Sequence, residues 1–333
     1  MEEFSLNARQ TLIMFIFQYH LVLADIIIEK DLHKKYQKNR WLSCWQESIE
    51  LFLKENFPND TLKITNDFDS LKMQAKEHIN ESGSKLTSYN ILLELTLFKA
   101  YYLLGHDDDE KFKYLGFNED ELIRKLKSFA RILDKDSEII RRLKSNYKEA
   151  IKGIKDENGF NPWILVGAVV LAVTSAFFTP AIAYLLAPIL APGLSGAAAV
   201  SAVLAALGGG AIAVGGFGMA GGFTVLVAGG AILGAGASAS ASAGISALFA
   251  QAPDSALVQA AKLEVIFREI VFIEKELPLA REVIKLQRQF IHSLEDKLDD
   301  LLIDKEKNKE EIKNLEKSIK YLKKALKRNQ DLL

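Results

Sequence analysis

The side chains that could carry chemistry are few and scattered. The five histidines show no metal-ligand spacing, and no His-Glu-x-x-His pattern is present. A single cysteine, Cys44, excludes an internal disulfide and any cysteine-based zinc cluster. The run from His106 to Glu110 has the oxygen ligands that a hard cation prefers, but it lacks the glycine and the terminal glutamate of a calcium loop. A solvated acidic turn is the preferred interpretation, and no metal site is expected.

Signatures of nucleophilic catalysis and of nucleotide binding are also missing. The sequence Gly193-Leu194-Ser195-Gly196 is one residue short of a nucleophile elbow. No lysine follows the glycine clusters of this region, as a phosphate-binding loop would require. A net charge of -1 and a pI near 6.6 give no general case for nucleic-acid binding. We therefore expect no enzyme, no cofactor and no nucleic-acid partner.

Charged residues are excluded from one long part of the chain. Residues 158–253, ninety-six in succession, contain no Asp, Glu, Lys, Arg or His. This segment, here called the neutral window, holds 17 of the 21 glycines and five of the seven prolines. The rest of the chain is about one third charged, which is typical of long charged helices. Because one core element does not need so many neutral residues, the window is expected to be a membrane segment.

The first part of the neutral window is strongly apolar. Asn161 and Pro162 are typical of a helix start, and Trp163 suits a membrane interface. The stretch from Ile164 to Leu190 is long enough for one bilayer crossing with a tilt or a kink. Pro180 and Pro188 interrupt this stretch, and Pro192 ends it.

The second part, residues 194–250, consists mostly of Ala, Gly, Ser and Val. Glycines separated by three residues share one helical face, where they let two membrane helices approach closely. We expect two to four crossings, and an even number returns both charged flanks to the same side. The glycines expected to form the hinge and the packing surfaces are Gly208, Gly209, Gly210, Gly218, Gly222, Gly230 and Gly234.

Residues 1–157 are expected to be helical. Thr11 to Lys30 carries its apolar residues on one stripe, and His20 and Asp25 within it favour a packed amphipathic helix over a membrane span. The other expected helices cover residues 41–55, 88–104 and 119–154, and the last of these would be a single long helix of about 54 Å.

The C-terminal third has the most regular pattern. From Ile266 to Leu333, steps of four and three residues continue without a slip, which predicts a coiled coil or a very long bundle helix. Unbroken, residues 263–333 would reach about 106 Å, although Pro278 should kink or interrupt the helix near Glu274. Such a helix must pack on the 119–154 helix, on N-terminal helices or on a second copy. The seam residues are Ile284, Ile291, Leu294, Leu298, Leu301, Ile312, Leu315, Ile319 and Leu322.

Basic residues gather just before the window and in the C-terminal tail. The first group favours the cytoplasmic side of a membrane and suits anionic head groups. For the tail from Lys305 onward, a solvated helix face is preferred, and contact with lipid or a partner is the alternative. The acidic chain start shows no classical export signal, so synthesis in the cytoplasm and action at the inner membrane, or at a target-cell membrane after non-classical export, are expected. The basic flank consists of Arg141, Arg142, Lys144, Lys148 and Lys152.

The order of these segments resembles that of α-helical pore-forming proteins, particularly the cytolysin-A-like toxins. The N-terminal helix, long helices, hydrophobic tongue and C-terminal helix of that family would correspond here to residues 11–30, the helices through Ile154, 158–253 and 256–333. The window is several times longer and richer in glycine than such a tongue. Its run from Gly215 to Gly222 is more similar to apolipoprotein-L-like proteins, which also have a downstream leucine-zipper helix. Both resemblances imply membrane permeabilisation, and the first implies that residues 12–28 become membrane-active.

We expect an all-α fold, an elongated bundle of long antiparallel helices or a coiled coil with an inserted glycine-rich membrane segment. Its domains would be 1–157, 158–253 and 254–333. The expected function is insertion of the window into a lipid bilayer to form an oligomeric pore or disrupt the membrane, as a toxin or a cell-killing defence effector. Expected partners are the bilayer and further copies of the chain or a related subunit. The alternatives are a permanently anchored coiled-coil tether and a wholly soluble protein with a glycine-rich core.

Overall fold

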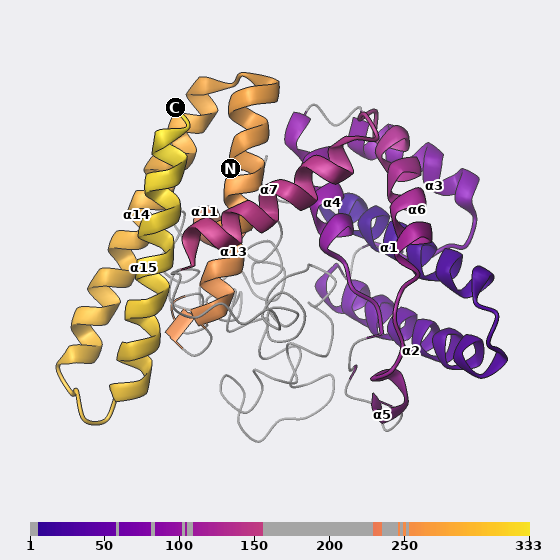
Figure 1. Ribbon diagram of the computed structural model, residues 1–333, viewed down its shortest axis with the longest axis horizontal. Coiled ribbons are helices and arrows are strands. Elements are labelled where there is room, and N and C mark those ends of the chain that lie inside the picture. Colours follow the sequence, from indigo (N-terminus) through magenta and orange to yellow (C-terminus); the bar gives the residue numbers. More distant parts are fainter. Residues whose placement is uncertain are drawn as a thin grey trace. The chain divides into compact units, whose positions relative to one another are not determined.

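Helices make up every regular element of the described chain, which confirms the all-α class (Figure 1). The computed structural model describes residues 6–57, 60–80, 84–101, 104, 109–155, 229–234, 246, 249–250 and 253–333. These residues group into two compact units. The N-terminal unit covers residues 6–144, and the C-terminal unit holds the described residues from 145 onward, so that the boundary lies inside one helix.

The N-terminal unit has helix starts that its sequence encodes locally. Asn7 Oδ1 accepts a hydrogen bond from the backbone of Gln10, whose side chain bonds back to Asn7. Asp31 caps the second helix by accepting hydrogen bonds from the backbone amides of His33 and Lys34. The elements are α1 (Ala8–Ile28), α2 (Leu32–Asn56), α3 (Phe68–Ala75), η2 (Lys76–Asn80, a π-helix), α4 (Lys85–Leu97), α5 (Asp109–Phe112), α6 (Glu119–Ile132) and the first residues of α7 (Ile139–Ile154).

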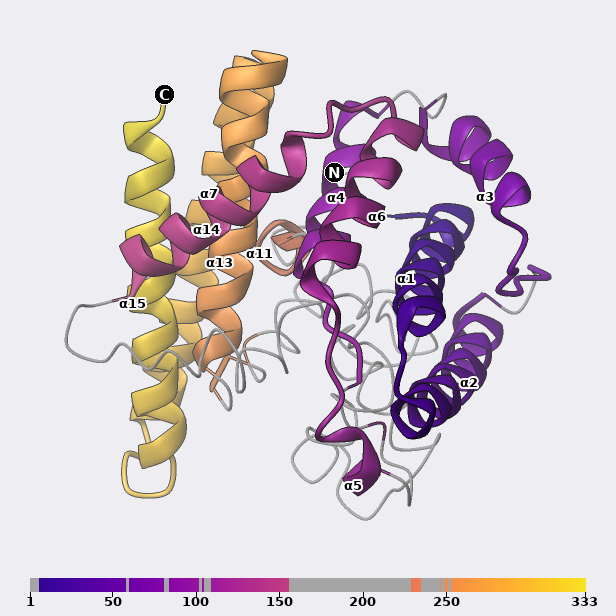
Figure 2. The ribbon, with the colours of Figure 1, turned by 45° about the vertical axis from the view of Figure 1, so that its right-hand side comes forward.

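Helix α1 is the core of the N-terminal unit, and the single buried stripe expected for it is wrong. Residues 12–17 are all buried, because α2, α3, α4 and α6 pack around the helix (Figure 2). A helix surrounded in this way is apolar on every side. Among the described residues α1 is the one helix with the length and composition of a membrane span; its mean hydropathy is 2.0, and 78% of that stretch is buried within the protein, as in a core helix.

The single long helix expected over residues 119–154 is wrong, because the chain turns between α6 and α7. Asp134 adopts a left-handed conformation with φ 53°. The Lys135 amide donates to the Ala130 carbonyl at 2.9 Å, which closes the C-terminus of α6. Asp136 Oδ1 then accepts from the Glu138 amide at 2.7 Å, immediately before α7. The apolar spacing continues across this turn and therefore conceals it.

The helix expected over residues 88–104 also ends early, at Leu97. Tyr101 follows with φ 64°, a strained conformation for a bulky residue. Its hydroxyl donates to Asp25 Oδ2 at 2.6 Å, and the same oxygen accepts from Lys38 Nζ at 2.6 Å. Asp25 Oδ1 accepts from the Asn118 amide at 2.7 Å. One carboxylate, 1% exposed, thus joins α1, α2 and the segments flanking α5 by charge-assisted hydrogen bonds.

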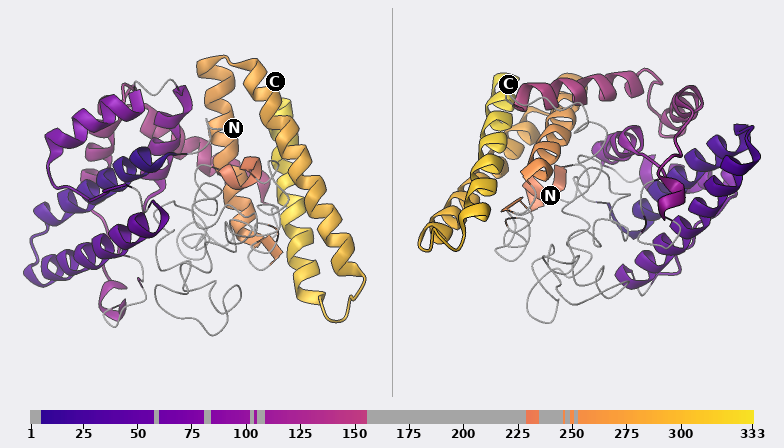
Figure 3. Two further views of the ribbon diagram at one scale, coloured as in Figure 1. Left: turned by 180° about the vertical axis from the view of Figure 1, so that it is seen from behind. Right: turned by 60° about the horizontal axis from the view of Figure 1, so that its bottom comes forward.

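The C-terminal unit is an arrangement of packed helices (Figure 3). Helix α13 is its centre, since residues 255–267 are all buried. Helices α14 and α15 run antiparallel and pack along each other, and α15 also packs on α13. The elements are the second half of α7, α11 (Gly230–Gly234), α13 (Pro253–Arg268), η10 (Glu269–Glu274, a π-helix), α14 (Leu277–Leu302) and α15 (Lys309–Asp331).

The helix of about 106 Å expected over residues 263–333 is wrong, because the chain reverses twice. The first reversal is at Lys275, which has φ 56°. Lys275 is adjacent to Glu274, near which the interruption caused by Pro278 was expected. The second reversal, at residues 303–308, was not expected. Here Asn308 Nδ2 donates to the Leu301 carbonyl at 3.0 Å and closes the end of α14.

This second reversal folds the apolar seam back onto itself within one chain. Gln287 and Asn329, two polar seam positions at equal sequence distance from Asn308, are both buried. Asn329 Nδ2 donates to Gln287 Oε1 at 3.1 Å, which marks the register of α14 against α15. Leu298 and Ile312 are partly exposed, whereas the buried seam residues are Ile284, Ile291, Leu294, Leu301, Leu315, Ile319 and Leu322.

Candidate functional site

The two ends of the neutral window meet in the C-terminal unit. Lys155 is the last described residue before the window, and Asp254 directly follows it. Lys317 Nζ on α15 lies 3.2 Å from Asp254 Oδ1. Burial lowers the pKa of Lys155, Asp254 acts in the opposite direction, and Lys317 lowers it further, so the three charges lie within electrostatic reach of one another. The described residues on either side of the window therefore lie close together in this unit.

The described end of the window packs on the unit through α11. This short helix contacts α13 and α14, and its Ile232 and Leu233 are buried. Gly229, immediately before it, has φ +81°, a conformation that favours glycine. A Cβ atom at this position would lie 3.0 Å from the backbone nitrogen and the Cβ of Leu263. Glycine is thus needed here for both the backbone conformation and the close approach to α13.

Phe249 makes a second contact between the window and the unit. Its buried ring lies 5.8 Å from the Phe290 ring of α14, centroid to centroid, in an edge-to-face arrangement. Its carbonyl accepts a 2.9 Å hydrogen bond from the buried hydroxyl of Ser318 on α15. The end of the window is therefore fastened to both helices of the α14 and α15 pair. We call these contacts, together with the meeting point at Lys317, the anchorage.

An ion-pair cluster holds α7, α13 and α15 together beside the anchorage. Glu264 is 0% exposed and accepts from Arg328 Nε and Nη2, both at 2.8 Å, and from Arg268 Nη2 at 2.9 Å. Arg268 also lies 2.6 Å from Glu149 of α7, and its hydrogen bond is the main reason that the pKa of Glu149 is lowered. Glu264 needs these partners because an unpaired buried carboxylate is costly. A Cβ at Gly153 would overlap the Arg328 guanidinium, so α7 passes close to the cluster.

Most of the window residues expected to act in the membrane lie outside the described residues. Gly230 and Gly234 are the exceptions: they begin and end α11 and lie against the C-terminal unit. The positions outside the described residues are Trp163, Pro180, Pro188, Pro192, Gly208, Gly209, Gly210, Gly218 and Gly222.

The basic flank lies on α7. Lys144 Nζ is 3.5 Å from Glu119, and Arg141 Nη1 is 4.0 Å from Glu138. Such exposed pairs contribute little stability, so the flank keeps its positive character. Arg142 and Lys144 are partly exposed, whereas the fully exposed members are Arg141, Lys148 and Lys152.

Sequence reasoning missed the residues that form the anchorage and the ion-pair cluster. Glu264 lies within a helix of mostly small and apolar residues, and a charge in such a setting signals a buried pair. Asp254 is the first charged residue after the window and follows Pro253 at a helix start, which marks the boundary. Phe249 carried no signal, since apolar residues are common throughout the window.

Within the described ranges, no group of three or more His, Cys, Asp or Glu side chains is placed to hold a metal ion. Comparisons with protein families, with curated proteins and with solved structures found no match to this chain. The function is therefore argued from the residues of the chain itself.

Proposed function

We propose that this protein is membrane-active: its charged helices store the neutral window, and a trigger releases it into a bilayer, where it forms an oligomeric pore or disrupts the membrane. The observation that carries this proposal is the anchorage. Ile232, Leu233 and Phe249, near the end of an uncharged segment of ninety-six residues, are buried against charged helices. Both ends of that segment meet at Lys317.

The difference between water and lipid supplies the driving force. Exposed apolar surface costs about 25 cal/mol per Å² in water, and a bilayer core removes this cost. The window carries no Asp, Glu, Lys, Arg or His, and a charged side chain of this kind would cost about 3 kcal/mol at the bilayer centre. The contacts of α11 and Phe249 with the C-terminal unit compete with lipid for the same side chains. The balance between the two environments decides whether the window is stored or inserted.

Assembly in the membrane would use the small residues of the window. The spacing of Gly218 and Gly222, and of Gly230 and Gly234, would place each pair on one face of a membrane helix, and such faces let membrane helices pack closely. On release, the face of α11 that contacts α13 and α14 becomes available to another helix. The partners would be further copies of this chain or a related subunit, in the setting of a toxin or a cell-killing defence effector.

Dye release from lipid vesicles tests this proposal. Phe249→Ala should release dye faster than the wild-type chain, because removing a buried phenylalanine ring costs about 3–5 kcal/mol of packing in the stored state. Phe272→Ala is the matched control, since Phe272 is 54% exposed in the same unit, and it should behave as the wild type does. Circular dichroism checks that both variants remain helical.

A second pair of substitutions tests the membrane step. Gly218→Leu with Gly222→Leu should abolish dye release and leave the helicity of the flanking units unchanged, because leucine prevents close helix approach. Dye release that persists in this variant would refute the packing role of these glycines. A wild-type chain that binds vesicles without releasing dye would be a permanently anchored tether, and the pore proposal would then be wrong.

A further inference from the structure

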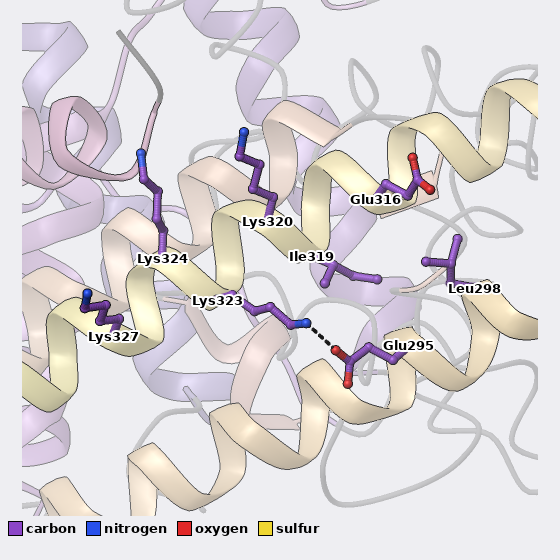
Figure 4. Close-up of a pocket in the computed structure, with 8 residues that line it drawn as sticks. All are labelled: Glu295, Leu298, Glu316, Ile319, Lys320, Lys323, Lys324 and Lys327. Carbon is purple, nitrogen blue, oxygen red and sulfur yellow. Dashed lines mark ion pairs between the residues drawn. The ribbon is translucent and has the colours of Figure 1, made fainter.

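The pair of helices α14 and α15 carries a groove that the proposed function does not use. The groove has a volume of about 500 Å³. Its lining includes Leu298 of α14, which is partly exposed, Ile319 of α15, which is largely buried, and the carboxylates of Glu295 and Glu316. Lys320, Lys323, Lys324 and Lys327 contribute a row of ammonium groups (Figure 4). An apolar groove with a basic border fits an amphiphile with a negative head better than it fits a small polar ligand.

The basic character of this surface extends along most of α15. Between Glu316 and Asp331, every charged residue of the helix is a lysine or an arginine. Lys323 Nζ lies 2.5 Å from Glu295 Oε1 of α14, so this carboxylate offsets Lys323. In Figure 4, Lys320, Lys324 and Lys327 point to one side of α15, away from that ion pair. Their spacing spans about 10 Å along the helix, which gives a linear array of positive charge.

This array continues to the meeting point of the window ends. Lys317 lies one turn before Lys320 on α15 and pairs with Asp254 at the end of the window. On the other side of the window, Lys155 lies within electrostatic reach of both residues, and Lys152 is exposed one turn earlier on α7. A negatively charged surface bound to the array would therefore lie next to the residues that flank the window.

We propose that Lys320, Lys324 and Lys327 dock the protein on a bilayer with anionic lipid head groups, with the partly exposed Leu298 contacting the apolar part of a lipid. This inference rests on the proposed function, and it adds the class of membrane that the protein selects. A bilayer fits better than a nucleic acid because the groove offers apolar side chains rather than aromatic rings for base stacking.

Binding of the full-length chain to vesicles tests the docking surface. The test variant is Lys320→Gln with Lys324→Gln and Lys327→Gln, which removes three charges from exposed or partly exposed positions. The matched control is Lys285→Gln with Lys297→Gln and Lys305→Gln, which removes three charges from exposed positions elsewhere on the same pair of helices and their turn. Sedimentation with phosphatidylglycerol-containing vesicles and with pure phosphatidylcholine vesicles measures binding, dye release is followed in parallel, and circular dichroism checks folding.

The test variant should bind the anionic vesicles about a hundredfold more weakly than the wild type, because each lysine near an anionic surface raises the binding constant by a factor of about five. The control should lose far less. Equal losses in the two variants, or equal wild-type binding to neutral vesicles, would overturn the docking surface. Dye release from neutral vesicles would then leave the proposed function standing, whereas selective anionic binding without dye release supports docking and refutes the pore. Binding to duplex DNA that the test variant loses, without vesicle binding, would identify a nucleic-acid surface instead.

Discussion

Gly153→Ala should destabilise the C-terminal unit, although the same change in most helices is favourable. A Cβ at Gly153 would overlap the guanidinium of Arg328 and lie 2.9 Å from its Nη2. The guanidinium must therefore move away from Glu264, to which it makes two hydrogen bonds of 2.8 Å. Charge-assisted bonds of this kind contribute about 1.5–3 kcal/mol, and Glu264 would keep only Arg268 as a partner. Replacing glycine by alanine returns about 0.5–1 kcal/mol, so the net loss is about 1–2 kcal/mol.

The sign of the effect should reverse when Arg328 is replaced. In an Arg328→Met background, Gly153→Ala has no ion pair to displace and should stabilise the chain by about 0.5–1 kcal/mol. Urea denaturation of the four chains, followed by circular dichroism, measures the coupling between the two positions. Gly116→Ala, at a site where a Cβ meets nothing within 4 Å, controls for the general effect of removing a glycine. If Gly153→Ala shifts stability in the same direction with and without Arg328, the reasoning about the cluster is wrong.

Two further outcomes follow from buried polar groups. Burial, and then the Lys125 charge, lowers the pKa of His20 to about 4, with Asp67 acting in the opposite direction. His20 therefore takes up a proton near pH 6.5 in the unfolded chain, but only near pH 4 in the folded chain. The free energy of unfolding should fall by about 3 kcal/mol as the pH drops from 7 to 4. His20→Phe should remove this part of the pH dependence, as measured by urea titrations at each pH. Replacing Gln287 and Asn329 together by leucine should leave stability unchanged or raise it. Replacing Gln287 alone should cost about 1–3 kcal/mol, because Asn329 loses its buried partner. Thermal unfolding that ranks the two variants in the opposite order would contradict this prediction.

Helix content could be predicted from the sequence, and helix boundaries could not. Apolar spacing over residues 119–154 and 263–333 identifies helical chain, but it continues unchanged through turns. The turn at Asp134 depends on an aspartate that tolerates a left-handed backbone, a weak and local signal among charged residues. Helix α1 shows the opposite failure. Its polar residues suggested one solvent face, yet His20 and Asp25 are buried, and Asp25 bonds to Tyr101 and Lys38 from distant segments.

The antiparallel packing of α14 on α15 could have been predicted from the positions of the polar residues in the apolar seam. Of the polar seam positions, Lys305 and Asn308 lie in or next to the turn, while Gln287 and Asn329 pair with each other across it. A symmetric placement of polar residues about one point thus favours an antiparallel pair within one chain over a continuous helix. The anchorage has no equivalent signal, because contacts such as that of Phe249 with Phe290 join residues that no local pattern relates.

Lys155 and Asp254, which flank the window, lie close to each other and to Lys317. The stability of the helical units should therefore depend little on the number of residues between Lys155 and Asp254. Closing a loop costs only about 0.6 kcal/mol more each time its length doubles. Insertions or deletions among residues 158–228 should therefore leave the folding of both helical units nearly unchanged. The proposed membrane segment can therefore vary in length, to match a thicker or thinner bilayer, while the helical units stay the same.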